Sequence, residues 1–231
     1  ESRGTSGGSN EANTAANNAR TLEQFEYDNG YNNFDVRHTF NASLIYDVPY
    51  RGAGVTGVLL GNWQVGGILT LQSGIPATIN IGGQDNSLTQ STYDRPNATG
   101  ISAVPDNQGT GGWYNRAAYV LAPLGQFGTV GRNSATSPGI YTINAEVHKN
   151  IRMPYNENHQ LQFRVEAFNL MNHPVWGEPQ RNMLAGAAIP GAPANAPRAG
   201  FGVISGLLNQ LNGFPPSIPM RQIQLGLKYT F

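Results

Sequence analysis

Five charged or titratable side chains recur at polar positions of segments in which apolar and polar residues alternate: Glu146, His148, Arg164, Glu166 and Lys228. Paired carboxylates of this kind could act as general acid and base if they lay in a dry cleft. On adjacent antiparallel strands, however, Glu146 and Arg164 would be direct or diagonal neighbours and would pair with each other. We therefore predict a row of charges that lines a wet surface, and no catalytic site.

A glycine motif, GAGVTG from Gly52 to Gly57, matches the dinucleotide-binding pattern G-x-G-x-x-G. That pattern binds a pyrophosphate only where the N-terminus of a helix follows the loop. The following residues, VLLGNWQV, are interpreted as running into a strand. We predict a turn in which glycine relieves backbone strain, and no nucleotide site.

The histidines do not form a metal-binding pattern. His38, His148, His159 and His173 show no pair at ligand spacing, so they are interpreted as polar-face or rim residues. The chain has no cysteine, which removes thiol catalysis, disulfides and cysteine-ligated zinc. No P-loop occurs. We expect neither a cofactor, a metal nor an enzymatic activity.

Composition points to strands joined by irregular connections. The 14 basic and 14 acidic residues balance, so polycationic binding to nucleic acid is not expected. The sequence contains no run of about 18 apolar residues, so it does not predict a membrane-spanning helix. Frequent glycine and proline favour strands with long loops. The chain begins with Glu1, and we interpret it as a piece of a longer protein whose N-terminal part lies upstream.

Alternation with a period of two predicts five strands, each with one apolar and one polar face. They are expected at 36–48, 62–74, 140–151, 159–170 and 222–231. Long connections precede the first strand and follow the second and fourth, and short ones follow the first and third. The sequence therefore predicts an all-β, antiparallel up-and-down meander with its long loops at one end.

Two environments produce such strands: a soluble β-sandwich, or an outer-membrane barrel whose apolar face meets lipid and whose polar face lines a lumen. Alternating long and short loops are typical of the barrel. Tyr46 and Trp63 fall on the apolar face near the short connections, where aromatic rings suit a membrane interface. Lys149 and Arg221 break the apolar pattern, and we expect both to snorkel from strand ends.

The segments FDVRHTFNASLIYDVP, GNWQVGGILTLQSGIPATI, DRPN, GTVGRNSATSPG, LQFRVEAFNLMNHPVWGEP and RQIQLGLKYTF resemble the C-terminal barrel region of TonB-dependent receptors, most closely the Oar-like subgroup. This resemblance implies a large barrel of which the chain supplies the last five strands. It also implies an upstream plug, contact with a TonB-type energy coupler, and an unknown ligand. The final residues resemble the signal read by the outer-membrane barrel-assembly machinery, through Gln224, Gly226, Tyr229 and Phe231.

The expected organisation is an external loop segment over residues 1–35 and a barrel portion over residues 36–231, in the outer membrane of a diderm bacterium and in contact with its lipid. Within the long loop, the aromatic residues Trp113, Tyr114, Tyr119 and Phe127 could bind a ligand, but we favour an interpretation in which they fold the loop upon itself.

Two alternative functions stay open: a structural or adhesive barrel that displays its loops, and a soluble β-sandwich binding module.

Overall fold

The computed structural model describes residues 3–4, 25–50, 52, 54–90, 93–153, 156–208 and 220–231. The chain divides into two compact units. The first, here called the loop unit, comprises Glu1–Arg37, Ser73–Gly139 and Trp176–Pro215. The second, the sheet unit, comprises His38–Gln72, Ile140–Val175 and Pro216–Phe231.

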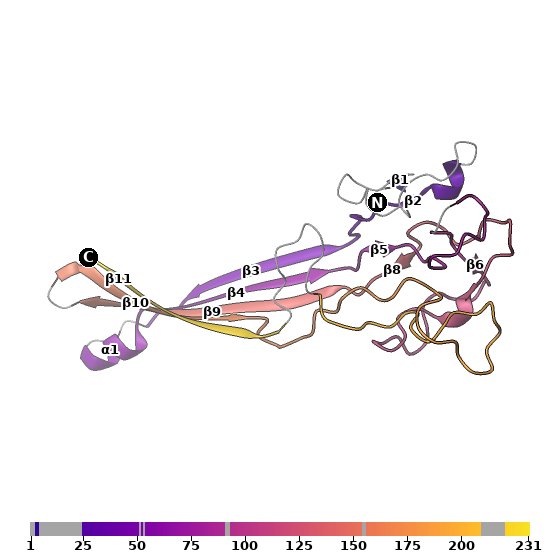
Figure 1. The fold of residues 1–231 in the computed structure, drawn as a ribbon. Helices are drawn as coiled ribbons and strands as arrows, with labels where there is room; N and C mark the ends of the chain where they lie inside the picture. The colour runs from indigo at the N-terminus through magenta and orange to yellow at the C-terminus, as the bar shows by residue number, and fades with distance from the viewer. Residues whose placement is uncertain are drawn as a thin grey trace. The chain divides into compact units, whose positions relative to one another are not determined.

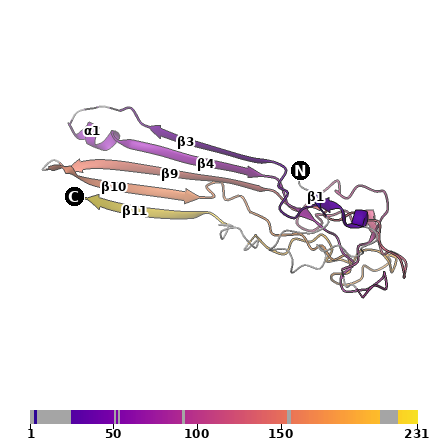
Figure 2. The same cartoon turned by 90° about the horizontal axis from the view of Figure 1, so that it is seen from above.

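The sheet unit is one antiparallel sheet whose strands lie side by side in chain order (Figures 1 and 2). Its strands are β3 (Thr39–Asp47), β4 (Trp63–Gln72), β9 (Ile140–Met153), β10 (Asn156–Phe168) and β11 (Gln222–Thr230). Consecutive strands of this series pair with each other, so that β3 and β11 form the two edges of the sheet. The predicted all-β, five-stranded up-and-down meander is confirmed.

Register places the predicted apolar positions on one side of the sheet. Directly paired residues share a face, and Tyr46, Val65, Val147, Val165 and Leu225 form one continuous row across all five strands. The same holds for the neighbouring rows, and we call this side the apolar face. The opposite side, the polar face, carries the alternate residues of each strand.

The apolar face is open in the structure. Leu44, Leu225 and Leu227 are 68%, 67% and 70% exposed, and Tyr229 is 44% exposed. The other sheets formed by described residues have two strands each and belong to the loop unit. Side chains so exposed are not the interior of a sandwich, so the alternative of a soluble β-sandwich module does not hold.

The two short connections lie at one end of the meander. Residues 154–155 join β9 to β10, and the link from β3 to β4 contains the helix α1 (Gly54–Leu60). The expectation that the glycine motif runs directly into a strand is therefore wrong. Because α1 links antiparallel strands, it does not form the βαβ unit that a dinucleotide site requires. No helix among the described residues is long and apolar enough to cross a membrane.

The loop unit has short elements around its own core. Its elements are β1 (Arg3–Gly4), the 3-10 helix η3 (Phe25–Asp28), β2 (Gly30–Tyr31), β5 (Pro76–Ala77), β6 (Asn97–Ala98), the 3-10 helix η4 (Arg116–Ala118), β7 (Tyr119–Val120) and β8 (Ala135–Thr136). Three antiparallel pairs form: β1 with β2, β5 with β8, and β6 with β7. The described residues of the predicted segment 1–35 lie in this unit.

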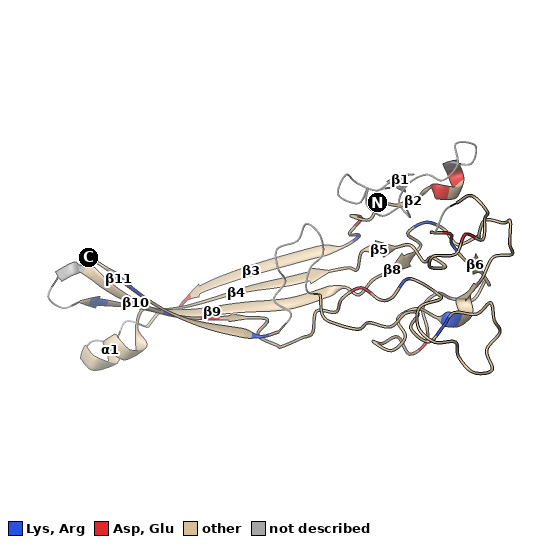
Figure 3. Ribbon diagram, viewed as in Figure 1, with Lys and Arg blue, Asp and Glu red and all other residues tan. Residues whose placement is uncertain are grey.

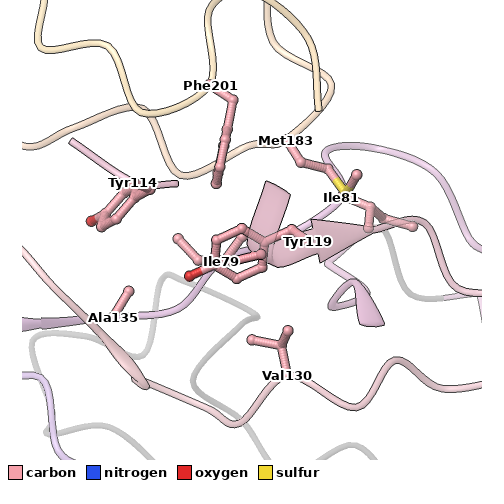
Figure 4. Close-up of a cluster of buried hydrophobic side chains, with 9 residues drawn as sticks. Ile79, Ile81, Tyr114, Tyr119, Val130, Ala135, Met183 and Phe201 are labelled. Atoms are coloured by element: carbon pink, nitrogen blue, oxygen red, sulfur yellow. The ribbon is translucent and has the colours of Figure 1, made fainter. Parts of the chain in front are cut away.

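The ring of Phe201 lies in the core of the loop unit, where Ile79, Ile81 and Met183 are also fully buried (Figure 4). Its centroid lies 5.7 Å from that of Tyr114 and 5.4 Å from that of Tyr119, the latter edge-to-face. Such aromatic contacts add to the stabilisation from buried apolar area. The expectation that the loop's aromatic side chains fold the loop upon itself is confirmed for these two tyrosines.

Candidate functional site: the polar face of the sheet

All five predicted charged residues lie on the polar face. His148 pairs directly with Arg164, Glu146 with Glu166, and Lys228 with Gln162. Charged residues are sparse on the strands, which are mostly uncharged in Figure 3. The register of β9, β10 and β11 therefore brings these charges together into one band on the polar face. The spacing of the residues in the sequence predicted their face but not their pairing.

Arg164 is the centre of this band. Its Nη1 lies 3.2 Å from Oε1 of Glu166, and its Nη2 donates to the side-chain oxygen of Gln162 at 3.5 Å. Glu146 is diagonal to Arg164, as predicted, but the ion pair forms with Glu166 on the same strand. Both partners are partly exposed, so the pair contributes about 0–1 kcal/mol to stability. Arg164 therefore affects the local charge of the polar face more than it affects the stability of the sheet.

Two carboxylates face each other beside this ion pair. Glu146 lies directly opposite Glu166, and like charges at such positions repel. Room for Glu146 comes from Gly66, its partner on β4. A Cβ atom at Gly66 would lie 2.8 Å from Cγ of Glu146. At this level of the band two carboxylates stand against one guanidinium, and this level can attract a cationic group.

A hollow of 270 Å³ adjoins the two glutamates. Its lining includes apolar side chains of the polar face, Ile45, Ile68 and Phe168, together with Glu146 and Glu166. Ile45 and Ile68 are 68% and 51% exposed. The alternating pattern predicted polar residues on this face. Ile45 and Ile68 are exceptions, because they are apolar residues at positions that face this side. The result is a mixed surface, acidic and apolar, suited to an amphipathic ligand.

A second hollow of 410 Å³ lies on the polar face at the end with the short connections. It is lined by Asp47, Val48, Pro49, Tyr50, Asn62, Trp63, Gln64, Asn150, Arg152 and Gln160. Within it the Gln64 amide donates to the Asp47 carboxylate. Next to it, the Gln162 amide donates to Asn150 Oδ1 at 2.9 Å. Cross-strand bonds of this kind fix polar side chains on an exposed sheet surface.

Lys149 departs from the expectation that it snorkels to water. The side chain lies on the apolar face, is 7% exposed, and donates from Nζ to the carbonyls of Leu59 at 3.0 Å and Gly61 at 2.7 Å. Its Nζ lies 4.8 Å from the centre of the Trp63 ring. A buried ammonium needs such acceptors, and the carbonyls at the end of α1 supply them. Arg221 lies just before β11, is exposed, and its N–H donates to Asn172 Oδ1.

The predicted interface aromatics lie on the apolar face at the end with the short connections. Tyr46 is 53% exposed. Trp63 is half-buried, and its Nε1 donates to the Leu59 carbonyl at 2.9 Å. The predicted role of these rings at a membrane interface stays a prediction.

The residues of the predicted assembly signal lie on both faces of β11 and just after its end. Gln224 lies on the polar face opposite Glu166, and Gly226 lies opposite Arg164. Tyr229 lies on the apolar face, and its hydroxyl is 2.5 Å from Nδ1 of His159. Phe231 is 89% exposed, with its ring centroid 6.2 Å from that of Tyr229. Recognition of these residues by an assembly machinery stays a prediction.

The remaining histidines show no metal site. The ring of His173 packs edge-to-face on Tyr141 with centroids 5.3 Å apart, and His38 is exposed just before β3. Among the residues that the structure describes, no group of three or more His, Cys, Asp or Glu side chains could hold a metal ion.

In the loop unit, the motifs DRPN and GRN meet the N-terminal segment. The Arg95 guanidinium lies 3.3 Å from Asp28 Oδ1, with both side chains 1% exposed, and 3.7 Å from the centre of the Tyr27 ring. Its Nη2 donates to the Tyr27 carbonyl at 2.7 Å. Arg132 donates to the Asp28 carbonyl at 3.5 Å. Sequence reasoning missed this cluster, because its members are far apart in the chain and follow no period.

Burial changes the titration of several loop-unit groups. It lowers the pKa of Arg132; the Asp28 carboxylate opposes this change and the Arg95 guanidinium adds to it. It raises the pKa of Tyr119 to about 12. Burial would also raise the pKa of Asp85, but hydrogen bonds from the Thr89 and Gln90 N–H groups and from other neighbours lower it overall.

A protein-family model described as an outer membrane beta barrel domain matches residues 2–224. The chain belongs to this family. The barrel domain therefore lies in the cell outer membrane, where barrel strands turn an apolar face to lipid and a polar face to the lumen. No curated protein and no solved structure matches the chain.

Proposed function

We propose that this barrel domain is part of an outer-membrane TonB-dependent receptor of the Oar-like kind, and that it takes part in binding a ligand and moving it across the outer membrane. Family membership and the motifs that resemble the subgroup support this proposal. The observation that carries it is the charged band beside the hollow at Glu146 and Glu166, because a transport path needs side chains that interact with cargo along the lumen.

The two units would divide the work. The loop unit, with its own buried core, would present a defined surface for the first contact with the ligand. The polar face would then meet the ligand or a plug that fills the lumen. Two carboxylates with one guanidinium favour cationic or amphipathic groups at this level.

The proposed partners follow from this assignment. They are outer-membrane lipid on the apolar face, the barrel-assembly machinery at the last strand, and a TonB-type coupler that acts through an upstream region. We propose no catalytic role and no nucleic-acid partner for the barrel domain.

The proposal is tested with the full-length gene in its own host. Spent medium from wild-type cells, a deletion strain and a strain without the energy coupler is compared by mass spectrometry. The same compounds should persist in the medium of both mutant strains. The proposal would be contradicted if the strain without the coupler still removed these compounds from its medium while the deletion strain did not. Identical media from all three strains would also contradict it.

A structural or adhesive barrel is the second candidate. Its support is a group of apolar side chains exposed on the loop unit, Leu88, Ile101, Val104 and Leu124, which are 54–73% exposed. Such side chains could contact another surface. If the deletion strain lost attachment to abiotic or cell surfaces while its medium matched that of the wild type, this candidate would replace the transporter.

A further inference from the structure

The helix α1 presents apolar side chains that the described protein does not cover. Val55, Val58, Leu59 and Leu60 are 75%, 57%, 60% and 53% exposed. The helix has no charged residue and no buried residue. Exposed apolar side chains gathered on one short element indicate an interaction surface.

The position of α1 is fixed from the apolar face of the sheet. Trp63 and Lys149 pair directly across β4 and β9 and share that face with Val65 and Val147. The Trp63 Nε1 and the Lys149 Nζ both donate to the Leu59 carbonyl, and Lys149 also donates to that of Gly61. The last turn of the helix is therefore held over the apolar face.

These contacts explain why the helix forms at all. A helix of seven residues is marginal in water, and valine and threonine lower its propensity further. The ammonium of Lys149 satisfies carbonyls that have no partner within the helix, and a positive charge at that end is favourable. The same carbonyls stabilise a charge that would otherwise be costly on a lipid-facing surface.

The position of α1 also fits a membrane interface. It lies at the end of the sheet with the short connections and the C-terminus (Figures 1 and 2). In outer-membrane barrels the short connections are periplasmic. At this end the apolar face also carries Tyr46 and Tyr229, both partly exposed. The exposed side chains of α1 are thus continuous with the surface that a barrel of this family turns to lipid.

We propose that α1 is an interfacial anchor that inserts its apolar side chains into the periplasmic leaflet of the outer membrane, at the boundary between phospholipid headgroups and acyl chains. Lys149 and Trp63 hold it there, and so set the depth of β3 and β4 in the bilayer. The anchor rests on family membership and on the geometry of α1, and does not require the proposed transport function.

The test uses single cysteines in the full-length protein, reconstituted in phospholipid nanodiscs, with any cysteine outside this chain replaced. A nitroxide label at Val58→Cys or Leu59→Cys reports its depth through relaxation by oxygen, which concentrates in acyl chains, and by a water-soluble nickel chelate. Leu227→Cys on the apolar face is the lipid control. Thr230→Cys on the polar face, at the same end of the sheet, is the water control.

We expect the oxygen-to-nickel ratio at α1 to be close to that at Leu227→Cys and several-fold above that at Thr230→Cys. A ratio at α1 equal to that at Thr230→Cys would overturn the proposal. A second result would also overturn it. If neither oxygen nor the nickel chelate reached the label in whole membranes, but the nickel chelate reached it in nanodiscs, a protein partner would cover the helix in the cell.

Lys149→Met tests the holding contacts, with Lys149→Arg as the conservative variant. Lys149→Met should lower the ratio and raise label mobility at Leu59→Cys while leaving Leu227→Cys unchanged, and Lys149→Arg should restore part of the difference. Unchanged values at α1 in Lys149→Met would refute the role of Lys149. If that variant does not assemble, the ratios at Val58→Cys and Leu59→Cys with Lys149 intact still decide the location of the helix.

Discussion

The Asp28 carboxylate lies 3.3 Å from the Arg95 guanidinium, and both side chains are 1% exposed. This ion pair ties the N-terminal segment of the loop unit to the motif DRPN. Charges buried to this extent must compensate each other, because neither can be solvated by water. The conformation of the loop that contains Arg95 therefore depends on Asp28, which is far away in the chain.

Removing Asp28 should unfold part of the loop unit. Asp28→Ala leaves the buried Arg95 without its counter-ion, and we expect a loss of about 3–5 kcal/mol from the stability of this unit. Limited proteolysis of whole cells, read as the rate of cleavage within the external loops, measures the effect. Asp106→Ala, at an exposed position, is the matched control and should leave the rate unchanged. Equal rates in the two variants would show that the ion pair does not hold the unit together.

The two faces of β11 should respond differently to the same substitution. Leu225→Lys places a charge on the apolar face and should cost about 2–4 kcal/mol if that residue lies near the middle of the bilayer. Gln224→Lys, one residue away on the polar face, should change stability by less than about 1 kcal/mol. Urea unfolding of the protein folded into lipid vesicles gives both values. Equal costs would contradict the assignment of the apolar face to lipid.

Gly128 is a position where the loop unit has no room for a side chain. A Cβ atom there would lie 1.9 Å from the Arg95 carbonyl oxygen and 2.4 Å from that of Pro96. Because backbone atoms must move to admit it, Gly128→Ala should destabilise the unit by about 1–3 kcal/mol. Gly111→Ala meets nothing within 4 Å and serves as control. In a background where Trp113 is the only tryptophan, the change in its fluorescence on unfolding should shift to lower denaturant concentration only for Gly128→Ala.

The loop unit should lose stability at alkaline pH. Burial raises the pKa of Tyr119 from its ordinary value of 10.0 to about 12. Between these values the unfolded chain has lost the phenol proton and the folded chain keeps it, so stability falls as pH rises, by at most about 1.4 kcal/mol per pH unit for this residue.

Thermal unfolding from pH 9 to pH 12 checks this effect, and phenolate absorbance reports when the proton leaves. Tyr119→Phe should reduce the slope over that range, whereas Tyr93→Phe, at a position 39% exposed, should not. A wild-type slope no steeper than that of Tyr119→Phe would show that Tyr119 does not contribute.

The strands and their faces were predictable because the signal is local. A side chain at every second residue of a strand falls on the same face, so the alternation at Val65 or Leu225 identifies its side of the sheet without knowledge of its partner. Pairing neighbours in chain order with their apolar faces matched then predicts rows such as Val147 beside Val165. The charged residues of the polar face followed from the same parity.

The helix α1 and the ion pair of Arg164 were not predictable in this way. The residues of α1 have no helical period, and the acceptors at its end are stabilised by Lys149, about 90 residues later in the chain. Arg164 could reach Glu146 or Glu166, and side-chain geometry selected Glu166.

Alternation along the chain is enough to specify an antiparallel meander with one apolar and one polar face, because strand geometry repeats every two residues and needs only near neighbours. The contact of Asp28 with Arg95 in the loop unit, and the contact of Lys149 with the end of α1, depend on the three-dimensional fold. Those contacts join residues with no common period, and their stability comes from burial and compensation of charge, which exist only once distant segments have met.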